Sequence, residues 1–140
     1  MTLPVLYILM RNDLSSMNAG KAMAQASHAS NAFVKSFYKS ISNFNDENLS
    51  NAFYEWENST AQGFGTVLVL EAPYKDIEPR IDMFKQSGYL ADIINDPTYP
   101  LLDGSVVHYI SLNTCAYVFV PDKNTDILSK MLLCSFPLHK

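Results

Sequence analysis

An alanine-rich segment near the N-terminus constrains the fold most. It reads GKAMAQASHA over residues 20–29 and keeps a helical pattern to about Ile41. At about 100° per residue, one stripe collects polar or basic side chains, namely Lys21, Gln25, His28, Lys35 and Lys39. The opposite side collects apolar side chains, namely Ala22, Met23, Ala26, Phe33, Val34 and Phe37. The pattern predicts a helix with one face packed on a core and one face available for chemistry.

Strand and helix signals alternate along the rest of the chain. Short apolar runs predict strands at Leu3–Met10, Thr66–Leu70 and Leu90–Ile94, with the last core strand at either Val106–Ile110 or Cys115–Val120. Further helices are predicted at Leu49–Trp56, from a first turn near Pro79 to a stop at Gly88, and at Asp126–Cys134. Helices between strands imply crossover connections. We therefore predict a three-layer α/β domain with a mainly parallel, four-stranded mixed sheet covered by helices on both faces.

Composition favours one domain over residues 1–140, because 48% hydrophobic and 17% charged residues suffice for a sizeable core. The sequence lacks a run of eighteen apolar residues, and its first residues lack a basic region and a cleavage site. We therefore expect no membrane association, no signal peptide and a cytoplasmic location. Cys115 and Cys134 lack metal-ligand spacing, which favours packed, reduced thiols over a zinc site or a disulfide framework.

The net charge of −4 argues against a nucleic-acid-binding protein, because phosphate contacts normally need an excess of Lys and Arg. The charges are unevenly distributed, however. Four basic residues that could share a surface, Arg11, Lys21, Lys35 and Lys39, all lie in the first forty residues, whereas most acidic residues come later. A local basic face on an acidic protein is therefore compatible with the sequence.

Sites in α/β sheets gather at the carboxyl ends of parallel strands. The strand ending at Met10 is followed by Asp13 and, after a loop, by the start of the alanine-rich helix. The third predicted strand ends just before Asp96 and Thr98, which reach the same edge if the two strands are parallel. The residues predicted to converge on one cleft are Lys21, Gln25 and Asp96.

Two N-terminal motifs follow each other closely: LYILMRNDL over residues 6–14 and GKAMAQASHA over residues 20–29. This pair resembles the opening of the type 2 peptidyl-tRNA hydrolases, the archaeal and eukaryotic kind. In that family a strand ending in an Arg-x-Asp-Leu turn leads into a helix beginning Gly-Lys-x-x-Ala-Gln-x-x-His-Ala. Weaker similarity extends to TVLVLEAP over residues 66–73 and to IIND over residues 93–96, which is similar to the family's third strand and catalytic aspartate.

The chain departs from the family pattern after Asp96. The family continues into an Ala-Gly-Arg-Thr-Gln type of segment, whereas this chain reads PTYPLLDG over residues 97–104 and lacks the basic residue. Three residues are alternatives for the role of the family's threonine: Thr98, His108 and Thr114. The departure concerns the substrate-orienting half of the site more than the half that carries Lys21.

The resemblance implies hydrolysis of the ester that joins a peptide to the 3′ ribose of tRNA, without cofactor or metal. Lys21 would stabilise the oxyanion or bind the terminal phosphate. Gln25 would position a water or the carbonyl, and Asp96 would orient Lys21 or act as a base. The expected substrate contacts are Asp13, His28, Thr98, Lys35, Lys39 and Thr114. The implied partner is peptidyl-tRNA, and the resemblance also implies a homodimer.

Each functional interpretation has a structural alternative. Lysines such as Lys35 and Lys39 are common on solvated helix faces, and His28 could be a packed histidine. Asp13 could cap its loop, and Asp96 before a proline could be a turn residue. The whole chain could instead be a catalytically diverged tRNA-binding or interaction protein of the same fold, or a hydrolase of another nucleotide or acyl ester.

Overall fold

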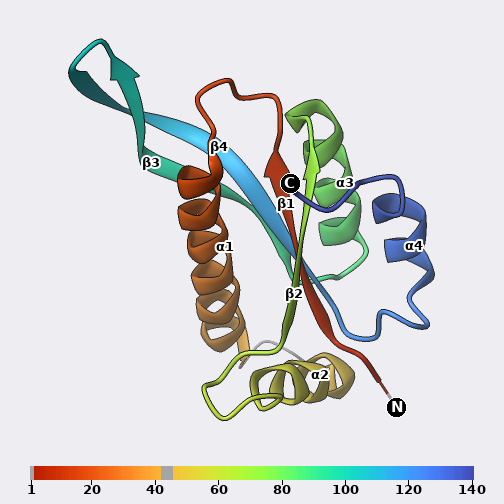
Figure 1. The fold of residues 1–140 in the computed structure, drawn as a ribbon. Coiled ribbons are helices and arrows are strands. Elements are labelled where there is room, and N and C mark those ends of the chain that lie inside the picture. The colour runs from red at the N-terminus through yellow and green to blue at the C-terminus, as the bar shows by residue number, and fades with distance from the viewer. Residues whose placement is uncertain (1, 42–45) are drawn as a thin grey trace.

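The computed structural model, which describes residues 2–41 and 46–140, is built around a four-stranded mixed sheet (Figure 1). The described elements in chain order are β1 (Val5–Arg11), α1 (Ala19–Ser40), α2 (Glu47–Glu57), β2 (Thr66–Ala72), α3 (Tyr74–Gln86), β3 (Ala91–Asp103), β4 (Val106–Val120) and α4 (Ile127–Leu133). The strand order is β2-β1-β4-β3. The predicted α/β class and the four-stranded mixed sheet are confirmed.

Strand direction brings two strand ends to one edge of the sheet. β1 pairs with β2 in parallel, whereas β4 pairs antiparallel with both β1 and β3. β1 and β3 therefore run the same way and end at the same edge, as predicted. The sheet is mixed as predicted, but it is not mainly parallel, because only the β1–β2 neighbour pair is parallel and β4 pairs antiparallel with both of its neighbours.

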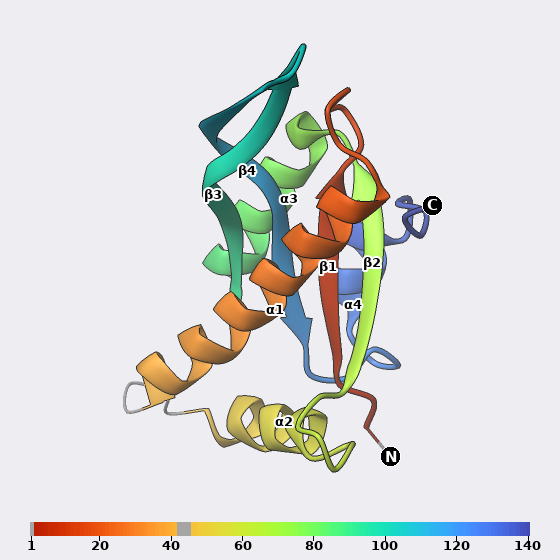
Figure 2. The same cartoon turned by 60° about the vertical axis from the view of Figure 1, so that its left-hand side comes forward.

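Helices pack on both faces of the sheet (Figure 2). Because strand side chains alternate between faces, Leu6 and Ile8 of β1 join the core under α1 and α2, whereas Tyr7 and Leu9 join the core under α3 and α4. Phe33 of α1 lies fully buried at the centre of the first core. Truncating such a ring to alanine typically costs about 3–5 kcal/mol of stability. The sheet is thus a rigid platform for residues at its edge.

Helix α1 is rotated relative to its predicted orientation. Its buried stripe comprises Ala22, Gln25, Ala29, Phe33 and Phe37. Alanine at positions 22 and 29 leaves little side chain between helix and sheet, so the helix packs along that line. Met23, predicted to be in the core, is instead 68% exposed, and Gln25, predicted on the open polar stripe, is buried. The helix begins after Asn18, whose side-chain oxygen accepts a 2.9 Å hydrogen bond from the Lys21 amide.

The last two strands, β3 and β4, are longer than predicted and form a hairpin. The predicted end of the third strand near Ile94 is wrong, and the two alternatives for the last strand are parts of one strand, β4. The β3–β4 pairing shifts register between Asp96 and Tyr99, which leaves Pro97 and Thr98 in an irregular stretch. A bulge of this kind tolerates a proline that would otherwise end the strand. Pro97 and Pro100 therefore lie in a strand, because pairing with β4 outweighs the preference of proline for loops.

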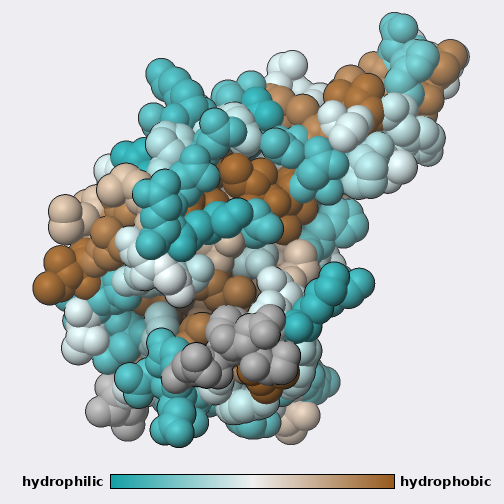
Figure 3. Space-filling view, turned by 180° about the vertical axis from the view of Figure 1, so that it is seen from behind, coloured by the Kyte–Doolittle hydropathy of each residue, from teal (hydrophilic) through white to brown (hydrophobic). Residues whose placement is uncertain are grey.

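The outer part of this hairpin, residues 99–112, is here called the arm. It extends beyond β1, which pairs only with residues 115–120 of β4 (Figure 1). Hydrophobic side chains are exposed along it, namely Leu102, Val106, Val107, Tyr109 and Ile110 (Figure 3). The arm turns back at Gly104, whose φ of 61° lies in the left-handed region that glycine adopts without strain.

Helix α3 begins earlier than predicted. Pro73 is its N-cap, and its carbonyl accepts hydrogen bonds from the amides of Asp76 and Ile77. Pro79 consequently lies inside the helix rather than in its first turn. Helix α4 agrees with the prediction within a residue at each end. None of the helices in the described ranges is both long enough and apolar enough to cross a membrane.

Candidate functional site

A buried chain of hydrogen bonds links α1 to both strands of the hairpin. The Thr114 hydroxyl of β4 donates to Gln25 Oε1 at 2.7 Å, and Gln25 Nε2 donates to Asp96 Oδ2 of β3 at 2.7 Å. The other oxygen of Asp96 accepts from the Thr98 amide at 2.9 Å and from its hydroxyl at 3.3 Å. Gln25 and Thr114 are almost inaccessible to solvent. Asp96 is therefore held in one orientation from two sides.

The environment of Asp96 keeps it ionised. Burial alone would raise the pKa of this carboxyl, because a charge is less stable away from water. Hydrogen bonds from Gln25 and Thr98, together with nearby His28, outweigh burial and lower the pKa of Asp96 below its usual value. The side chain is therefore a carboxylate at neutral pH, with a small exposed fraction.

Lys21 lies one helical turn before Gln25 and contacts β3. Its Nζ donates a 2.8 Å hydrogen bond to the Pro100 carbonyl and lies 5.2 Å from the centre of the Tyr99 ring. Within the described residues, Lys21 forms no ion pair with a carboxylate. Because an ammonium has three N–H donors, this arrangement leaves donors for an incoming anionic oxygen.

A surface hollow of about 400 Å³ adjoins the Asp96 cluster. Basic side chains of α1 line it, namely His28, Lys35 and Lys39, and Asn95 next to Asp96 lies on its β3 side. Lys35 and Lys39 are exposed, and one acidic residue, Asp92, is among the lining residues. The hollow thus offers positive charge to an anion directly beside the cluster.

Two residues proposed from the sequence lie outside this cluster. Asp13 pairs with Arg11 through two bonds of 2.8 and 3.1 Å and accepts from the Tyr74 amide at 3.3 Å, so it ties its loop to α3. The hydrogen bond from Arg11 lowers the pKa of Asp13. His108 lies on the arm, half-exposed and 3.7 Å from Asp103. The structure therefore brings Thr98 and Thr114, but not His108, to Gln25 and Asp96.

The family model "Peptidyl-tRNA hydrolase PTH2" matches residues 4–108, which is most of the chain. The chain belongs to this family. The matched range includes Lys21, Gln25, Asp96 and Thr98, and it ends before Thr114. No curated protein matches the chain.

The family's sequence pattern gave no indication of the residues that hold Lys21. Tyr99 and Pro100 follow the point where the third strand was predicted to end, so no strand was predicted for them. Their contact with Lys21 depends on the continuation of β3 beyond Asp96, and that continuation depends on pairing with β4. The β-rich run Val106–Ile110, treated in the sequence only as an alternative to Cys115–Val120, was the signal for the longer hairpin.

Neither cysteine supplies a nucleophile to the cluster of Lys21, Gln25 and Asp96. Burial raises the pKa of the Cys115 thiol to about 12, so that thiol stays protonated at neutral pH. Cys134 is exposed rather than packed as predicted, and both thiols are free. Within residues 2–41 and 46–140, no group of three or more His, Cys, Asp and Glu side chains is placed to hold a metal ion.

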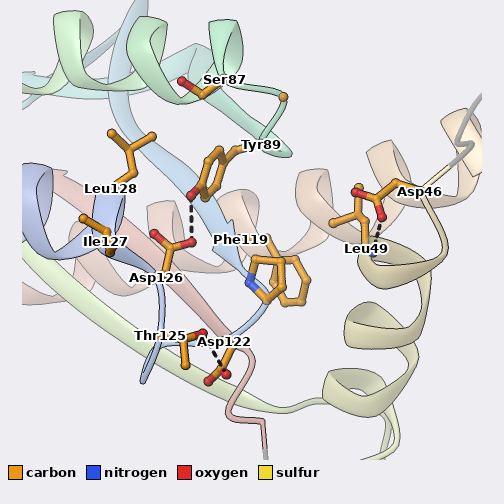
Figure 4. A pocket seen from close by; sticks show the side chains of 12 residues that line it. Asp46, Leu49, Ser87, Tyr89, Phe119, Asp122, Thr125, Asp126, Ile127 and Leu128 are labelled. Atoms are coloured by element: carbon orange, nitrogen blue, oxygen red, sulfur yellow. Dashed lines mark hydrogen bonds between the residues drawn. The ribbon is translucent and has the colours of Figure 1, made fainter.

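A larger hollow, of about 510 Å³, lies where β4 ends and β3 begins (Figure 4). Its carboxylates already hold local structure. Asp126 accepts from the Ser129 amide and from the Tyr89 hydroxyl, each at 2.7 Å, and thereby caps α4. Asp46 caps α2, and Asp122 accepts from the Thr125 hydroxyl at 3.0 Å. These contacts explain the acidic residues without a ligand.

Proposed function

We propose that the chain hydrolyses the ester of peptidyl-tRNA, without a cofactor, at the cluster of Lys21, Gln25 and Asp96. The observation that carries this proposal is an ionised, oriented carboxylate on β3, with an ammonium that contacts the same strand at Pro100 and has no carboxylate partner in the described residues. Ester hydrolysis needs both a group that accepts a proton from water and a group that stabilises the oxyanion. Membership of the PTH2 family supports the same reaction at the family level.

In the proposed reaction Asp96 acts as the base and Lys21 stabilises the oxyanion. A water molecule attacks the ester carbonyl carbon while Asp96 accepts one of its protons. Lys21 donates a hydrogen bond to the carbonyl oxygen, where negative charge develops. The bond from the carbonyl carbon to the ribose 3′ oxygen then breaks. The ribose oxygen takes the proton from Asp96 and leaves as a hydroxyl, which regenerates the carboxylate.

Gln25 acts as a positioning residue in this scheme. Both ends of its amide are engaged, the oxygen by Thr114 and the nitrogen by Asp96. This arrangement favours orientation of Asp96 over direct binding of a water or of the ester carbonyl. Thr98 of β3 holds the second oxygen of Asp96, whereas Thr114 of β4 acts on Asp96 only through Gln25.

The basic hollow provides the contacts to tRNA in this proposal. His28, Lys35 and Lys39 follow one side of α1 away from Asp96, in the direction in which the acceptor stem would extend. Lysine contacts to phosphates supply affinity that is independent of sequence and sensitive to salt. The overall charge of −4 is compatible with this role because the positive residues are local. Such an activity belongs with translation in the cytoplasm.

The direct test is release of free tRNA from an N-acetylaminoacyl-tRNA by the purified chain. We expect turnover by the wild type and loss of turnover in Lys21→Ala. The matched control is Lys75→Ala, because Lys75 is an exposed lysine on α3. A wild-type chain that folds but releases no tRNA would overturn the proposal.

A second candidate is a tRNA-binding protein of the same fold that has lost the chemistry. The observation that favours it is the PTYPLLDG segment of β3, which replaces the family's usual continuation after the aspartate. This candidate predicts salt-sensitive tRNA binding without turnover, whereas hydrolysis excludes it. A substrate role for Asp13 and the homodimer stay predictions, and light scattering on the purified chain tests the homodimer.

A further inference from the structure

The arm joins the candidate site at its base. Tyr99 is fully buried there, and its ring centre lies 5.2 Å from Lys21 Nζ. The next residue, Pro100, accepts the 2.8 Å hydrogen bond from the same nitrogen through its carbonyl. Two consecutive residues of β3 therefore contact the ammonium, one through a ring and one through the backbone.

Tyr99 is fixed by contacts on its far side. Its hydroxyl shares a 3.1 Å hydrogen bond with the Ser16 hydroxyl and lies 3.9 Å from Met17 Sδ. Both residues belong to the loop that leads into α1. Tyr99 also pairs with Ile110 across the arm. The ring is thus held between the β3–β4 hairpin and the loop before Lys21, so it has little freedom to move.

The contacts of Tyr99 and Pro100 orient the Lys21 ammonium without pairing it with a negative charge. A lysine side chain has four flexible carbons and loses conformational entropy when it is held in one geometry. A carboxylate partner would hold it but would also compete with a developing oxyanion for the same charge. A ring face and a carbonyl attract the ammonium without neutralising it. The base of the arm therefore orients Lys21 and leaves its charge available.

We propose that Tyr99 is a positioning residue that, with the Pro100 carbonyl, directs the Lys21 ammonium toward the reacting ester. The inference rests on the proposed function for its catalytic consequence. The position of Lys21 itself is a property of the chain that can be measured without a reaction. The two claims can therefore fail separately.

The test compares Tyr99→Phe, which keeps the ring, with Tyr99→Leu, which removes it. NMR of the Lys21 side chain should show a ring-current shift in the wild type and in Tyr99→Phe. The shift should be lost in Tyr99→Leu. The value of kcat should fall about 10-fold in Tyr99→Leu with little change in KM, and should stay within about 3-fold in Tyr99→Phe.

A double variant separates positioning from a general loss of packing. If Tyr99 acts through Lys21, Tyr99→Leu lowers the residual rate of Lys21→Ala no further. Tyr99→Met fills the space without a ring and replaces the leucine variant if that variant does not fold. A wild-type kcat in the ringless variant, or a further fall in the Lys21→Ala background, would overturn the inference. Absence of wild-type turnover with an intact ring-current shift would instead overturn the proposed function alone.

Discussion

The two hollows described above differ in charge more than in size. The larger hollow, at the edge where β3 begins, is lined by three aspartates, Asp46, Asp122 and Asp126, and its described lining residues include no Lys, Arg or His. The smaller hollow, between α1 and the first residues of β3, is lined by His28, Lys35 and Lys39 and by one aspartate, Asp92. A phosphate-bearing substrate is repelled at the larger hollow and attracted at the smaller one.

The carboxylates at the two edges also have different partners. Asp126 accepts from a backbone amide at the start of α4, which makes it part of a helix cap. Asp96 accepts from the buried side chain of Gln25 and lies on the strand whose Pro100 carbonyl accepts from the Lys21 ammonium. The comparison shows that the hydrogen-bond partners of a carboxylate indicate a catalytic role better than the volume of the neighbouring hollow does.

The largest effect is expected for Asp96→Asn. The amide has nearly the same shape but cannot accept a proton from water, so kcat should fall about 100-fold or more. Steady-state release of tRNA measures this loss. Asp82→Asn on the surface of α3 is the matched control and should retain wild-type kcat. An Asp96→Asn variant with full activity would place the chemistry elsewhere.

The next effect is expected for Gln25→Leu, which removes a hydrogen bond to Asp96 and leaves the buried Thr114 hydroxyl without its acceptor. The free energy of unfolding should fall by about 1–3 kcal/mol. Without this bond the pKa of Asp96 rises, so the acid limb of kcat/KM should move to higher pH. Thr114→Ser keeps the hydroxyl and should leave the acid limb of kcat/KM at its wild-type pH.

Gln25→Leu should also alter how the free energy of unfolding depends on pH. A carboxyl with a lowered pKa in the fold stabilises the fold above its unfolded pKa, and this contribution is lost as the pH falls through the folded pKa. Wild-type stability should therefore decline at and below the ordinary aspartate value of 3.8. Denaturant unfolding at several pH values should show a smaller decline for Gln25→Leu. An equal decline in both proteins contradicts the assigned contact.

A smaller effect, on substrate binding alone, is expected for the double variant Lys35→Ala with Lys39→Ala. Each lost phosphate contact should reduce the slope of log KM against log salt by about one. The value of kcat at saturating substrate should not change. Lys75→Ala with Lys123→Ala alters the net charge equally and should leave the slope unchanged. Equal slopes in all three proteins would remove these lysines from the tRNA surface.

The smallest effect on activity is expected at the opposite edge. Asp126→Ala removes the cap of α4, so the free energy of unfolding should fall by about 1 kcal/mol. Asp126→Asn can still cap the helix and should recover most of that loss. Both variants should keep wild-type kcat and KM. A loss of activity in Asp126→Ala at full folding would make the larger hollow part of the site.

The sequence was sufficient for the parts of the site that depend on local pattern. Helical spacing places Lys21 and Gln25 one turn apart, and the direction of two strands brings Asp96 to the same edge. The burial of Gln25 was not predictable from spacing, because the rotation of α1 is set by its packing through Ala22 and Ala29. The contacts of Tyr99 and Pro100 were also missed, because cross-strand pairing overrides the loop preference of proline.

The most direct test is to locate where the substrate binds. An uncleavable acceptor-stem RNA with an N-acetylaminoacyl group in 3′-amide linkage can be titrated into the isotope-labelled chain and followed by NMR. We predict chemical-shift changes along α1 from Lys21 to Lys39, at residues 95–100 and at Thr114. Changes centred instead on residues 87–89 and 121–128, around the larger hollow, would contradict the account.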